Sequence, residues 1–284
     1  MKIVVAGSDG FLGKEVCKLL KDQNHEIIRI DLERGVDLSI KDELKDIPKF
    51  DFFIHLANLV YVPASYENPE SFYRINYLTT LNALELCRKY SARLIYVSSY
   101  IYGSPQYLPV DEKHPIKPFN PYAQTKVICE ALCQGYNRDF GVKCSILRPF
   151  NIFGEGQKGK LLIPEIVSQL KQGKETITLR DAKPRRDYVD VKDVARAIVY
   201  CLKDKTEINA YNVCSGKSYS VEEITKTVNE LLKRKVEFRF SGSDRLMEVD
   251  ETVGSYSKIK ECLGWSPSIE FKKTIENILK SEEI

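Results

Sequence analysis

The sequence is poor in the residues that build metal sites, and its cysteines are not spaced for ligation. It has only three histidines, and its eight cysteines are scattered along 284 residues. The nearest pair, Cys129 and Cys133, has the spacing of neighbours on a helix, but no histidine accompanies it at a matching interval. A structural zinc site needs four ligands around the ion. The pattern therefore argues against a metal site and predicts reduced, mostly buried cysteines of a cytoplasmic protein.

Long apolar runs and an excess of either charge are also missing. No stretch approaches the roughly 18 consecutive apolar residues of a membrane-spanning helix, and residues 1–7 (MKIVVAG) lack the apolar region of a signal peptide. With 43 basic and 40 acidic residues, the formal net charge is +3. The basic runs at 183–186 (KPRR) and 233–235 (KRK) are short. This composition predicts a globular chain that binds neither membranes nor nucleic acid.

Short apolar runs alternate with amphipathic stretches over the first half of the chain. The runs are apolar throughout, as expected for strands that are buried on both faces of a sheet. The strands are expected at 2–6, 26–31, 50–57, 93–99 and 142–149, and the helices at 12–22, 69–90 and 120–140. This alternation predicts an α/β fold with a doubly wound parallel (Rossmann) sheet.

The chain changes character after Pro149, where glycine, lysine and proline become frequent. The further elements expected are helices at 164–172, 191–203 and 220–234 and a strand at 210–215. The helix and strand between 191 and 215 have the pattern of another unit of the parallel sheet. The expected domains are a large one of residues 1–149, rejoined by 191–215, and a smaller mixed α/β one of residues 150–190 and 216–284.

Residues 7–13 (GSDGFLG) place three glycines between a predicted strand and a predicted helix. Gly7 permits a tight turn, Gly10 lets backbone N–H groups approach a pyrophosphate, and Gly13 allows the helix to pack closely on the strand. A phosphate bound there lies at the positive end of the helix. Asp31 ends the second predicted strand, where a carboxylate can accept hydrogen bonds from both hydroxyls of an adenosine ribose. These residues predict a dinucleotide-binding site in the first domain.

The choice of dinucleotide depends on the charges beside that ribose. The Asp31 carboxylate would repel the 2′-phosphate of NADP and so favours NAD. Arg34 argues in the other direction, because it could reach a 2′-phosphate if the loop placed it there. Asp37 and Leu38 could flank the adenine, although an aspartate at such a position is also common in a simple turn. NAD is the cofactor that the sequence favours.

Tyr122 and Lys126 lie one helical turn apart in the segment 120–130 (NPYAQTKVICE). Such a pair is ordinary on a helix surface, but a nicotinamide enzyme must move a proton as it moves a hydride. The positive charges of Lys126 and of the nicotinamide ring favour the phenolate, and so predict a pKa of Tyr122 lowered from about 10 toward neutrality. Ser98 and Ser99 follow a predicted strand, where a hydroxyl could orient a substrate or simply end the strand.

Taken together, these motifs resemble those of the extended short-chain dehydrogenase/reductases, in their nucleotide-sugar epimerase/dehydratase branch. The resemblance covers nearly the whole chain and is specific because several motifs occur in the family's order. The matching stretches are 7–13 (the glycine motif), 55–58 (HLAN, the fourth-strand motif), 98–103 (SSYIYG, the catalytic-serine motif), 122–126 (Tyr-x-x-x-Lys), 148–154 (RPFNIFG) and 185–197 (both sugar-nucleotide stretches), and 263–267 (LGWSP).

The resemblance implies a role for each matching residue. Tyr122 is expected to be the acid–base group, Lys126 its partner and Ser98 the catalytic hydroxyl. The residues implied in cofactor binding are Gly7, Gly10, Phe11, Leu12, Gly13, Asp31, Arg34, Asp37, Leu38, Leu56, Ala57, Tyr122, Lys126 and Pro149. The residues implied in substrate binding are Ser98, Ser99, Tyr100, Tyr122, Asn151, Arg186 and Arg245. An arginine fork suits a diphosphate, although Arg186 could also belong to a solvated basic loop.

The resemblance implies an enzyme that uses NAD to act on a sugar linked to a nucleoside diphosphate. The dehydratases of the branch carry an Asp–Glu pair after the catalytic Ser/Thr, and this chain has Ser99 and Tyr100 there, which argues against water elimination. The leading expectation is an epimerase acting at C4. The alternatives are a nucleotide-linked 4-keto-sugar reductase and a non-catalytic NAD-binding protein.

The helices expected at 69–90 and 120–140 carry apolar residues on more than one face. One side can cover the sheet, and the other needs a loop or a partner subunit to cover it. In the resembled family, these two helices form the four-helix bundle of a dimer. We therefore expect a homodimer.

Overall fold

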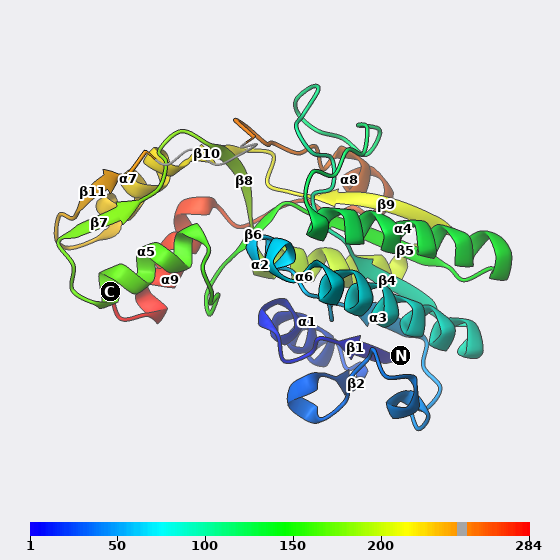
Figure 1. The fold of residues 1–284 in the computed structure, drawn as a ribbon. Helices are drawn as coiled ribbons and strands as arrows, with labels where there is room; N and C mark the ends of the chain where they lie inside the picture. The colour runs from blue at the N-terminus through cyan, green and yellow to red at the C-terminus, as the bar shows by residue number, and fades with distance from the viewer. Residues whose placement is uncertain (243–248) are drawn as a thin grey trace.

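The computed structural model describes residues 1–242 and 249–284 (Figure 1). At its centre is a parallel sheet with the strand order β2-β1-β3-β4-β5-β9. The strands are β1 (Lys2–Ala6), β2 (Glu26–Ile30), β3 (Phe52–His55), β4 (Arg93–Val97), β5 (Cys144–Pro149) and β9 (Ile208–Val213). Because β2 and β3 lie on opposite sides of β1, the strand order reverses there. Ligands of such sheets bind at the carboxyl ends of the strands beside this reversal.

Helices cover both faces of the sheet. Ile3 and Val5 of β1 pack toward α1 and α6, whereas Val4 and Ala6 pack toward α3 and α4. Successive side chains of a strand point to opposite faces, so burial on both sides explains why these strands are apolar throughout. The helices are α1 (Phe11–Asp22), α3 (Pro69–Tyr90), α4 (Pro121–Phe140) and α6 (Val191–Tyr200), with shorter segments at α2 (Val62–Glu67), η1 (Leu32–Arg34), η2 (Lys41–Leu44) and η3 (Cys201–Lys203).

A smaller mixed region lies beyond the carboxyl edge of the sheet, on the left in Figure 1. Its strands are β6 (Asn151–Phe153), β8 (Arg185–Asp190) and β10 (Ser218–Ser220) in one sheet and β7 (Thr176–Leu179) and β11 (Glu237–Phe240) in another. Its helices are α5 (Leu162–Lys171), α7 (Val221–Leu231) and α9 (Phe271–Ser281), whereas α8 (Ser257–Leu263) lies beside β9. This region has its own apolar core, which includes Ile166, Ile177, Ile224 and Phe271.

The predicted fold class is confirmed by the six-stranded parallel sheet and the smaller mixed α/β region. The predicted elements of the sheet and its helices are present, with ends that differ by a few residues. The chain also returns to the sheet after β8, because α6 packs on α1 and β9 pairs with β5. The short strands of the smaller region were not predicted, since β8 (RRDYVD) begins with charged residues and has no apolar run.

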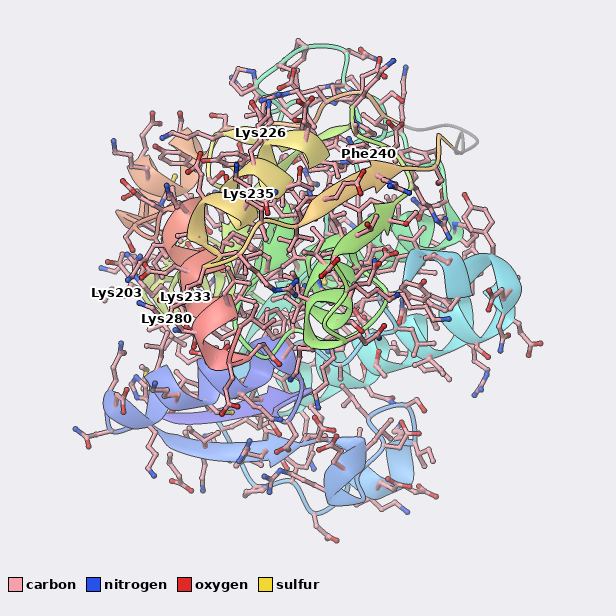
Figure 2. The ribbon with its side chains drawn as sticks, turned by 90° about the vertical axis from the view of Figure 1, so that its left-hand side faces the viewer. Lys203, Lys226, Lys233, Lys235, Phe240 and Lys280 are labelled. Atoms are coloured by element: carbon pink, nitrogen blue, oxygen red, sulfur yellow. The ribbon has the colours of Figure 1, made fainter. Side chains whose placement is uncertain are left out.

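Lysines on the outer side of the smaller region project away from the ribbon in Figure 2. Two of them pair with glutamates of their own helices, Lys226 with Glu222 and Lys280 with Glu276. Exposed pairs of this kind contribute little to stability but keep a helix surface solvated. This surface is therefore mixed in charge. Among the described residues, no helix combines the length and the apolar character needed to cross a membrane.

Candidate active site

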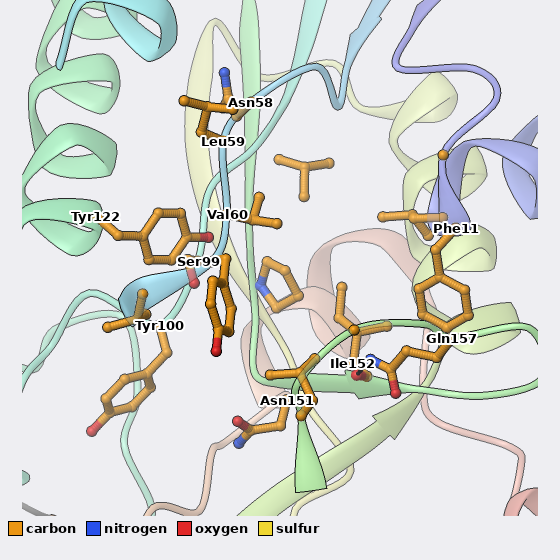
Figure 3. Close-up of a pocket in the computed structure, with 18 of the residues that line it drawn as sticks. Phe11, Asn58, Leu59, Val60, Ser99, Tyr100, Tyr122, Asn151, Ile152 and Gln157 are labelled. Carbon is orange, nitrogen blue, oxygen red and sulfur yellow. Dashed lines mark hydrogen bonds between the residues drawn. The ribbon is translucent and has the colours of Figure 1, made fainter. Parts of the chain in front are cut away.

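A cavity of about 1840 Å³ lies between the carboxyl edge of the sheet and the smaller region (Figure 3). It exceeds the several hundred Å³ of a usual small-molecule site, as a site for two large ligands requires. Residues after β1 to β5 form one part of its wall, and residues of α5, β7 and β8 form another. Every residue predicted for the site lines this cavity except Arg34, which lies outside its wall, and Arg245, which lies outside the described residues.

The glycine loop lies where the sequence predicts a pyrophosphate. Gly7 has a φ of +80°, a conformation that glycine adopts without strain. A Cβ atom added at Gly13 would lie 2.0 Å from the carbonyl oxygen of Gly7, so only glycine allows α1 to begin this close to the turn. Gly10 caps α1 with no side-chain hydrogen bond, and the first N–H groups of a helix are free to bind an anion. The loop therefore fits a dinucleotide phosphate.

Asp31 borders the same end of the cavity, where β2 finishes. Its two carboxylate oxygens accept backbone N–H groups, Oδ2 from Asp9 at 2.9 Å and Oδ1 from Glu33 at 3.1 Å. A carboxylate has further lone pairs, so ribose hydroxyls can be bound as well. Asp37 also lines the cavity, and its Oδ1 accepts the N–H of Ser39 at 2.8 Å, which is the turn that the sequence left as an alternative.

Arg34 does not point into the cavity but binds the carboxylate of Asp9. Its Nε lies 2.5 Å from Asp9 Oδ2 and its Nη2 lies 3.1 Å from Oδ1. Arg29 donates to the same carboxylate from Nη2 at 3.0 Å. The hydrogen bond from Arg34, helped by Ser8 and Arg29, lowers the pKa of Asp9 to about 2. The structure thus places a carboxylate between the two arginines nearest the adenosine end.

Tyr122 and Lys126 project from the first turns of α4. The helix begins there because Pro121 occupies its first position and the Asn120 side chain accepts the N–H of Ala123 at 2.7 Å. Tyr122 lines the cavity, and the Lys126 ammonium lies 5.9 Å from the centre of its ring. The predicted pair is therefore held one turn apart on one wall.

Burial governs the pKa of Tyr122 in the protein without its cofactor. Burial raises it to about 12, and a hydrogen-bonding contact with Ser99 opposes only part of this rise. Burial likewise lowers the pKa of Lys126 to about 8. Because the predicted lowering of the Tyr122 pKa depends also on the positive nicotinamide ring, it stays a prediction for the complex with NAD.

The two serines after β4 have different surroundings. Ser98 is 3% exposed, and its Oγ is buried with no hydrogen-bond partner among residues 1–242 and 249–284. Ser99 lies beside Tyr122 in Figure 3 and makes the contact that opposes the rise in its pKa. An unpaired buried hydroxyl is costly, and such groups often mark a functional site. The sequence assigned the catalytic hydroxyl to Ser98, and the geometry makes Ser99 a second candidate.

Asn58 is a residue of the site that the sequence reasoning did not single out. Its Oδ1 accepts a 2.5 Å hydrogen bond from Lys126 Nζ, which also donates to Val97 O at 2.9 Å. Its Nδ2 donates to Thr79 Oγ1 at 3.1 Å and to Ala57 O at 2.9 Å. A polar residue three positions after the end of β3, at the carboxyl edge of the sheet, was the available signal.

The other end of the cavity holds the residues predicted to bind the substrate. Asn151 lines the wall and donates from Nδ2 to Asp187 O at 3.0 Å. Arg186 also lines it and donates from Nη1 to Val249 O at 2.6 Å. Tyr100 donates to Gly103 O at 2.7 Å and faces the same space. These side chains provide amide, guanidinium and phenol groups opposite the glycine loop.

Comparison with known proteins agrees with this arrangement. Residues 3–214 match the model of the NAD dependent epimerase/dehydratase family. A putative UDP-glucose 4-epimerase of Methanocaldococcus jannaschii is 34% identical, over 98% of this chain and 97% of that protein. A GDP-6-deoxy-D-mannose reductase of Pseudomonas aeruginosa is 31% identical, over 99% of this chain and 97% of that protein.

Solved structures share the fold over nearly their whole length. RMD of Pseudomonas aeruginosa, complexed with NADPH, has a TM-score of 0.91 and 29% identity, covering 99% of this chain and 98% of that one. The UDP-glucose 4-epimerase of Thermus thermophilus, in complex with NAD, has a TM-score of 0.89 and 26% identity, covering 100% of this chain and 99% of that one. The predicted resemblance is confirmed: the chain belongs to the NAD-dependent epimerase/dehydratase family and is an enzyme of that family.

Proposed function

We propose that this enzyme is a nucleotide-sugar epimerase that inverts the configuration at C4 with NAD as its cofactor. The observation that carries the proposal is the Asp31 carboxylate beside the glycine loop, which opposes a 2′-phosphate and so favours NAD over NADP. A reductase consumes a reduced cofactor at every turnover and more often uses NADPH. An epimerase regenerates the oxidised cofactor within each cycle.

Tyr122 is the proposed acid–base group. Bound NAD supplies an acceptor and donor of hydride at the sugar carbon. Tyr122 takes the proton from the C4 hydroxyl. It returns the proton after the keto sugar has rotated in the cavity to present its other face. Burial raises the pKa of Tyr122 to about 12 in the protein alone, and the positive nicotinamide ring of bound NAD would favour the phenolate. Lys126 holds the nicotinamide ribose.

The remaining roles follow from the position of each side chain along the cavity. Gly7, Gly10 and Gly13 hold the pyrophosphate of the cofactor, and Asp31 its adenosine ribose. Asn151 and Arg186 bind the diphosphate of the substrate, for which a guanidinium is suited. In this assignment, residues 1–149 with 191–215 hold the cofactor. Residues 150–190 and 216–284 hold the nucleotide sugar.

Ser99 and Tyr100 bear on the competing activities. They occupy the place of the acidic pair of the dehydratases, and the pKa of Tyr100 is raised by burial, so neither provides a carboxylate for water elimination. The second candidate is a 4-keto-sugar reductase with the same catalytic residues, which the identity to the Pseudomonas reductase favours. A non-catalytic role is disfavoured by the complete set of serine, tyrosine and lysine at one cavity.

An isotope experiment separates the epimerase from the reductase. Nucleotide sugars deuterated at C4 are incubated with the purified protein, without added nicotinamide, and the products are analysed by mass spectrometry. The epimerase interconverts two sugars, keeps the label and causes no net change in the absorbance of reduced nicotinamide. A parallel incubation supplies nucleotide-linked 4-keto sugars with stoichiometric NADH or NADPH deuterated on the nicotinamide. Transfer of that label to the sugar, with no interconversion in the first incubation, establishes the reductase instead.

We further propose that the enzyme is a cytoplasmic homodimer formed by α3 and α4. Tyr73 and Tyr77 are 38% and 40% exposed and, with Leu81, form a stripe at helical spacing on α3. Ala131 is exposed on α4, which packs beside α3. Two such pairs of helices would bury these apolar side chains in a four-helix bundle. A reducing compartment agrees with the free cysteines, of which all but Cys262 are buried.

A further inference from the structure

We propose that Asp9 sets the cofactor preference of this enzyme by engaging Arg29 and Arg34, the two arginines next to Asp31. The inference rests on the proposed use of NAD and names the residue that enforces it. Asp9 does not line the cavity, so it acts through the arginines and is a positioning residue. Its effect would be to withhold from a 2′-phosphate the cations that NADP binding requires.

Asp9 connects the glycine loop to the end of β2 at the adenosine end of the site. It lies within the glycine loop, between Gly7 and Gly10, and its N–H donates to Asp31 Oδ2 at 2.9 Å. The loop and the end of β2 are thereby joined where the ribose hydroxyls bind. The side chain of Asp9 is consequently a near neighbour of any group attached to the ribose 2′-oxygen.

The carboxylate of Asp9 accepts hydrogen bonds from two arginines and one serine hydroxyl. Arg34 reaches both of its oxygens, at 2.5 and 3.1 Å, in the bidentate form that is the strongest for a guanidinium. Arg29 donates to Oδ1 at 3.0 Å and, from the same Nη2, to Ser8 O at 3.2 Å. The Ser8 hydroxyl donates to Oδ2 at 2.8 Å.

The charges at this end cancel, which is the core of the inference. Two carboxylates, Asp9 and Asp31, stand against two guanidinium groups, so no net positive charge meets a 2′-phosphate carrying nearly two negative charges. Both arginines are partly exposed to solvent: the side chains of Arg29 and Arg34 are 34% and 41% exposed. The side chain of Asp9 is only 14% exposed. Removal of the Asp9 charge would leave both arginines able to turn to a phosphate.

The geometry predicts that Asp31 alone does not determine selectivity. Removing its charge leaves Arg29 and Arg34 bound to Asp9, so the gain for NADP should be small. Removing the Asp9 charge frees both arginines while the Asp31 repulsion stays. The two changes together should therefore improve NADP binding by more than the sum of their separate free-energy effects, because each removes a different obstacle. The fold itself is no obstacle, since its relatives include complexes with NADPH and with NAD.

The test measures the dissociation constants of NAD⁺ and NADP⁺ by calorimetry on the purified full-length protein. Asp9→Asn should tighten NADP⁺ binding about tenfold, the value of one released charged hydrogen bond, and change NAD⁺ binding much less. Arg34→Ala should have little effect in the wild type and should abolish the gain in the Asp9→Asn background. Glu33→Gln is the matched control, because Glu33 lies at the same end but does not line the cavity, and no described arginine pairs with its carboxylate.

Three results would overturn the inference. One is an unchanged affinity for NADP⁺ in Asp9→Asn. Another is an equal weakening for both cofactors, which marks a purely structural role. The third is an equal gain in Glu33→Gln, which marks a general charge effect. Because the measurement needs no turnover, it stands apart from the isotope experiment: a reductase could still show the predicted gain, and an epimerase could lack it.

Discussion

The ammonium of Lys126 donates a 2.5 Å hydrogen bond to the side-chain oxygen of Asn58. A second bond, to Val97 O at 2.9 Å, places the ammonium between the ends of β3 and β4. Asn58 is itself oriented by Thr79 of α3, through the bond from its Nδ2. A lysine has a flexible stem, so its position beside Tyr122 depends on these acceptors.

Asn58→Ala is therefore expected to reduce turnover, by roughly ten- to a hundredfold, without abolishing the fold. The variant removes an acceptor of the charged lysine, so the pKa of Lys126 should fall further and the alkaline limb of the pH–rate profile should move to lower pH. Asn58→Asp keeps an acceptor and adds a negative charge, so the same limb should move to higher pH. If the alkaline limb moves in neither variant, Asn58 contributes only packing and does not affect the pKa of Lys126.

Tyr122→Phe is expected to lower turnover by about 10²- to 10⁴-fold, the usual contribution of a positioned acid–base group. The phenyl ring keeps the packing of α4, so NAD binding and the unfolding temperature should stay close to those of the wild type. Steady-state kinetics, calorimetry with NAD⁺ and thermal unfolding provide the three measurements. Near-normal turnover on the true substrate would falsify the assignment of the proton-transfer group.

The two serines after β4 can be separated by parallel alanine variants. Ser98→Ala removes a buried hydroxyl with no described partner, so it should not destabilise the protein. If Ser98 binds the reacting oxygen, as the family resemblance implies, this variant loses turnover more severely than Ser99→Ala. Loss of the Ser99 contact should instead raise the pKa of Tyr122 further and shift the pH–rate profile. The opposite ranking of turnover would move the catalytic role to Ser99.

Lys126→Met is expected to reveal the cost of the buried ammonium through the pH dependence of stability. The pKa of Lys126 is about 8 in the folded protein and 10.5 in the unfolded chain. Between these values the unfolded chain binds more protons, so the stability of the wild type rises with pH in this window. The free energy of unfolding of the wild type, minus that of Lys126→Met, should rise by about 2–3 kcal/mol from pH 7 to pH 10.

Urea unfolding at several pH values measures this difference, because contributions common to both proteins cancel. The control is Lys226→Met. The pKa of Lys226 is raised by its hydrogen bond to Glu222, so the difference in free energy of unfolding between the wild type and this variant should not rise with pH. A flat difference for Lys126→Met would mean that its ammonium is hydrated in solution.

The proposed dimer predicts that the wild type has the mass of two chains in light scattering at micromolar concentration. Tyr77→Glu introduces a charge into the exposed stripe of α3 and should give the monomer mass. Phe240→Glu is the matched control. Phe240 is 37% exposed on β11, which lies at the opposite side of the molecule from α3 and α4 in Figure 1, so its replacement should leave the dimer intact. A monomeric wild type, or dissociation by both variants, contradicts this interface.

The sheet and the glycine loop could be predicted from the sequence because their causes are local. Gly13 is required by an atom of Gly7 in the same short loop, and β1 is apolar because its own two faces are covered. Strand β8 could not be predicted in this way. Its Arg185 bonds to Ser218, and its Asp187 accepts the N–H of Gly216 and of Gly254. Such partners become neighbours only when distant segments fold together.

The same limit applies to the candidate site. Tyr122 and Lys126 are recognisable by spacing, but the direction of the tyrosine pKa depends on burial, which the spacing does not contain. Arg34 could have faced the cofactor as far as the sequence shows, and it is the fold of the loop that brings it to Asp9. The role of Asn58 could not be predicted from the sequence, because it depends on where the fold places the Lys126 ammonium.

The pairing of β9 with β5 has a consequence for the order in which the protein is made. The ribosome delivers β5 first, and the strand that covers its open edge follows only after β6, β7, β8 and the helical segments between them. Until then, β5 offers unpaired backbone groups and α1 lacks the apolar cover of α6, the two features that make nascent chains self-associate. A chain truncated between Pro149 and Val191 therefore lacks both covers, and the sheet is complete only once residues up to Val213 have been made.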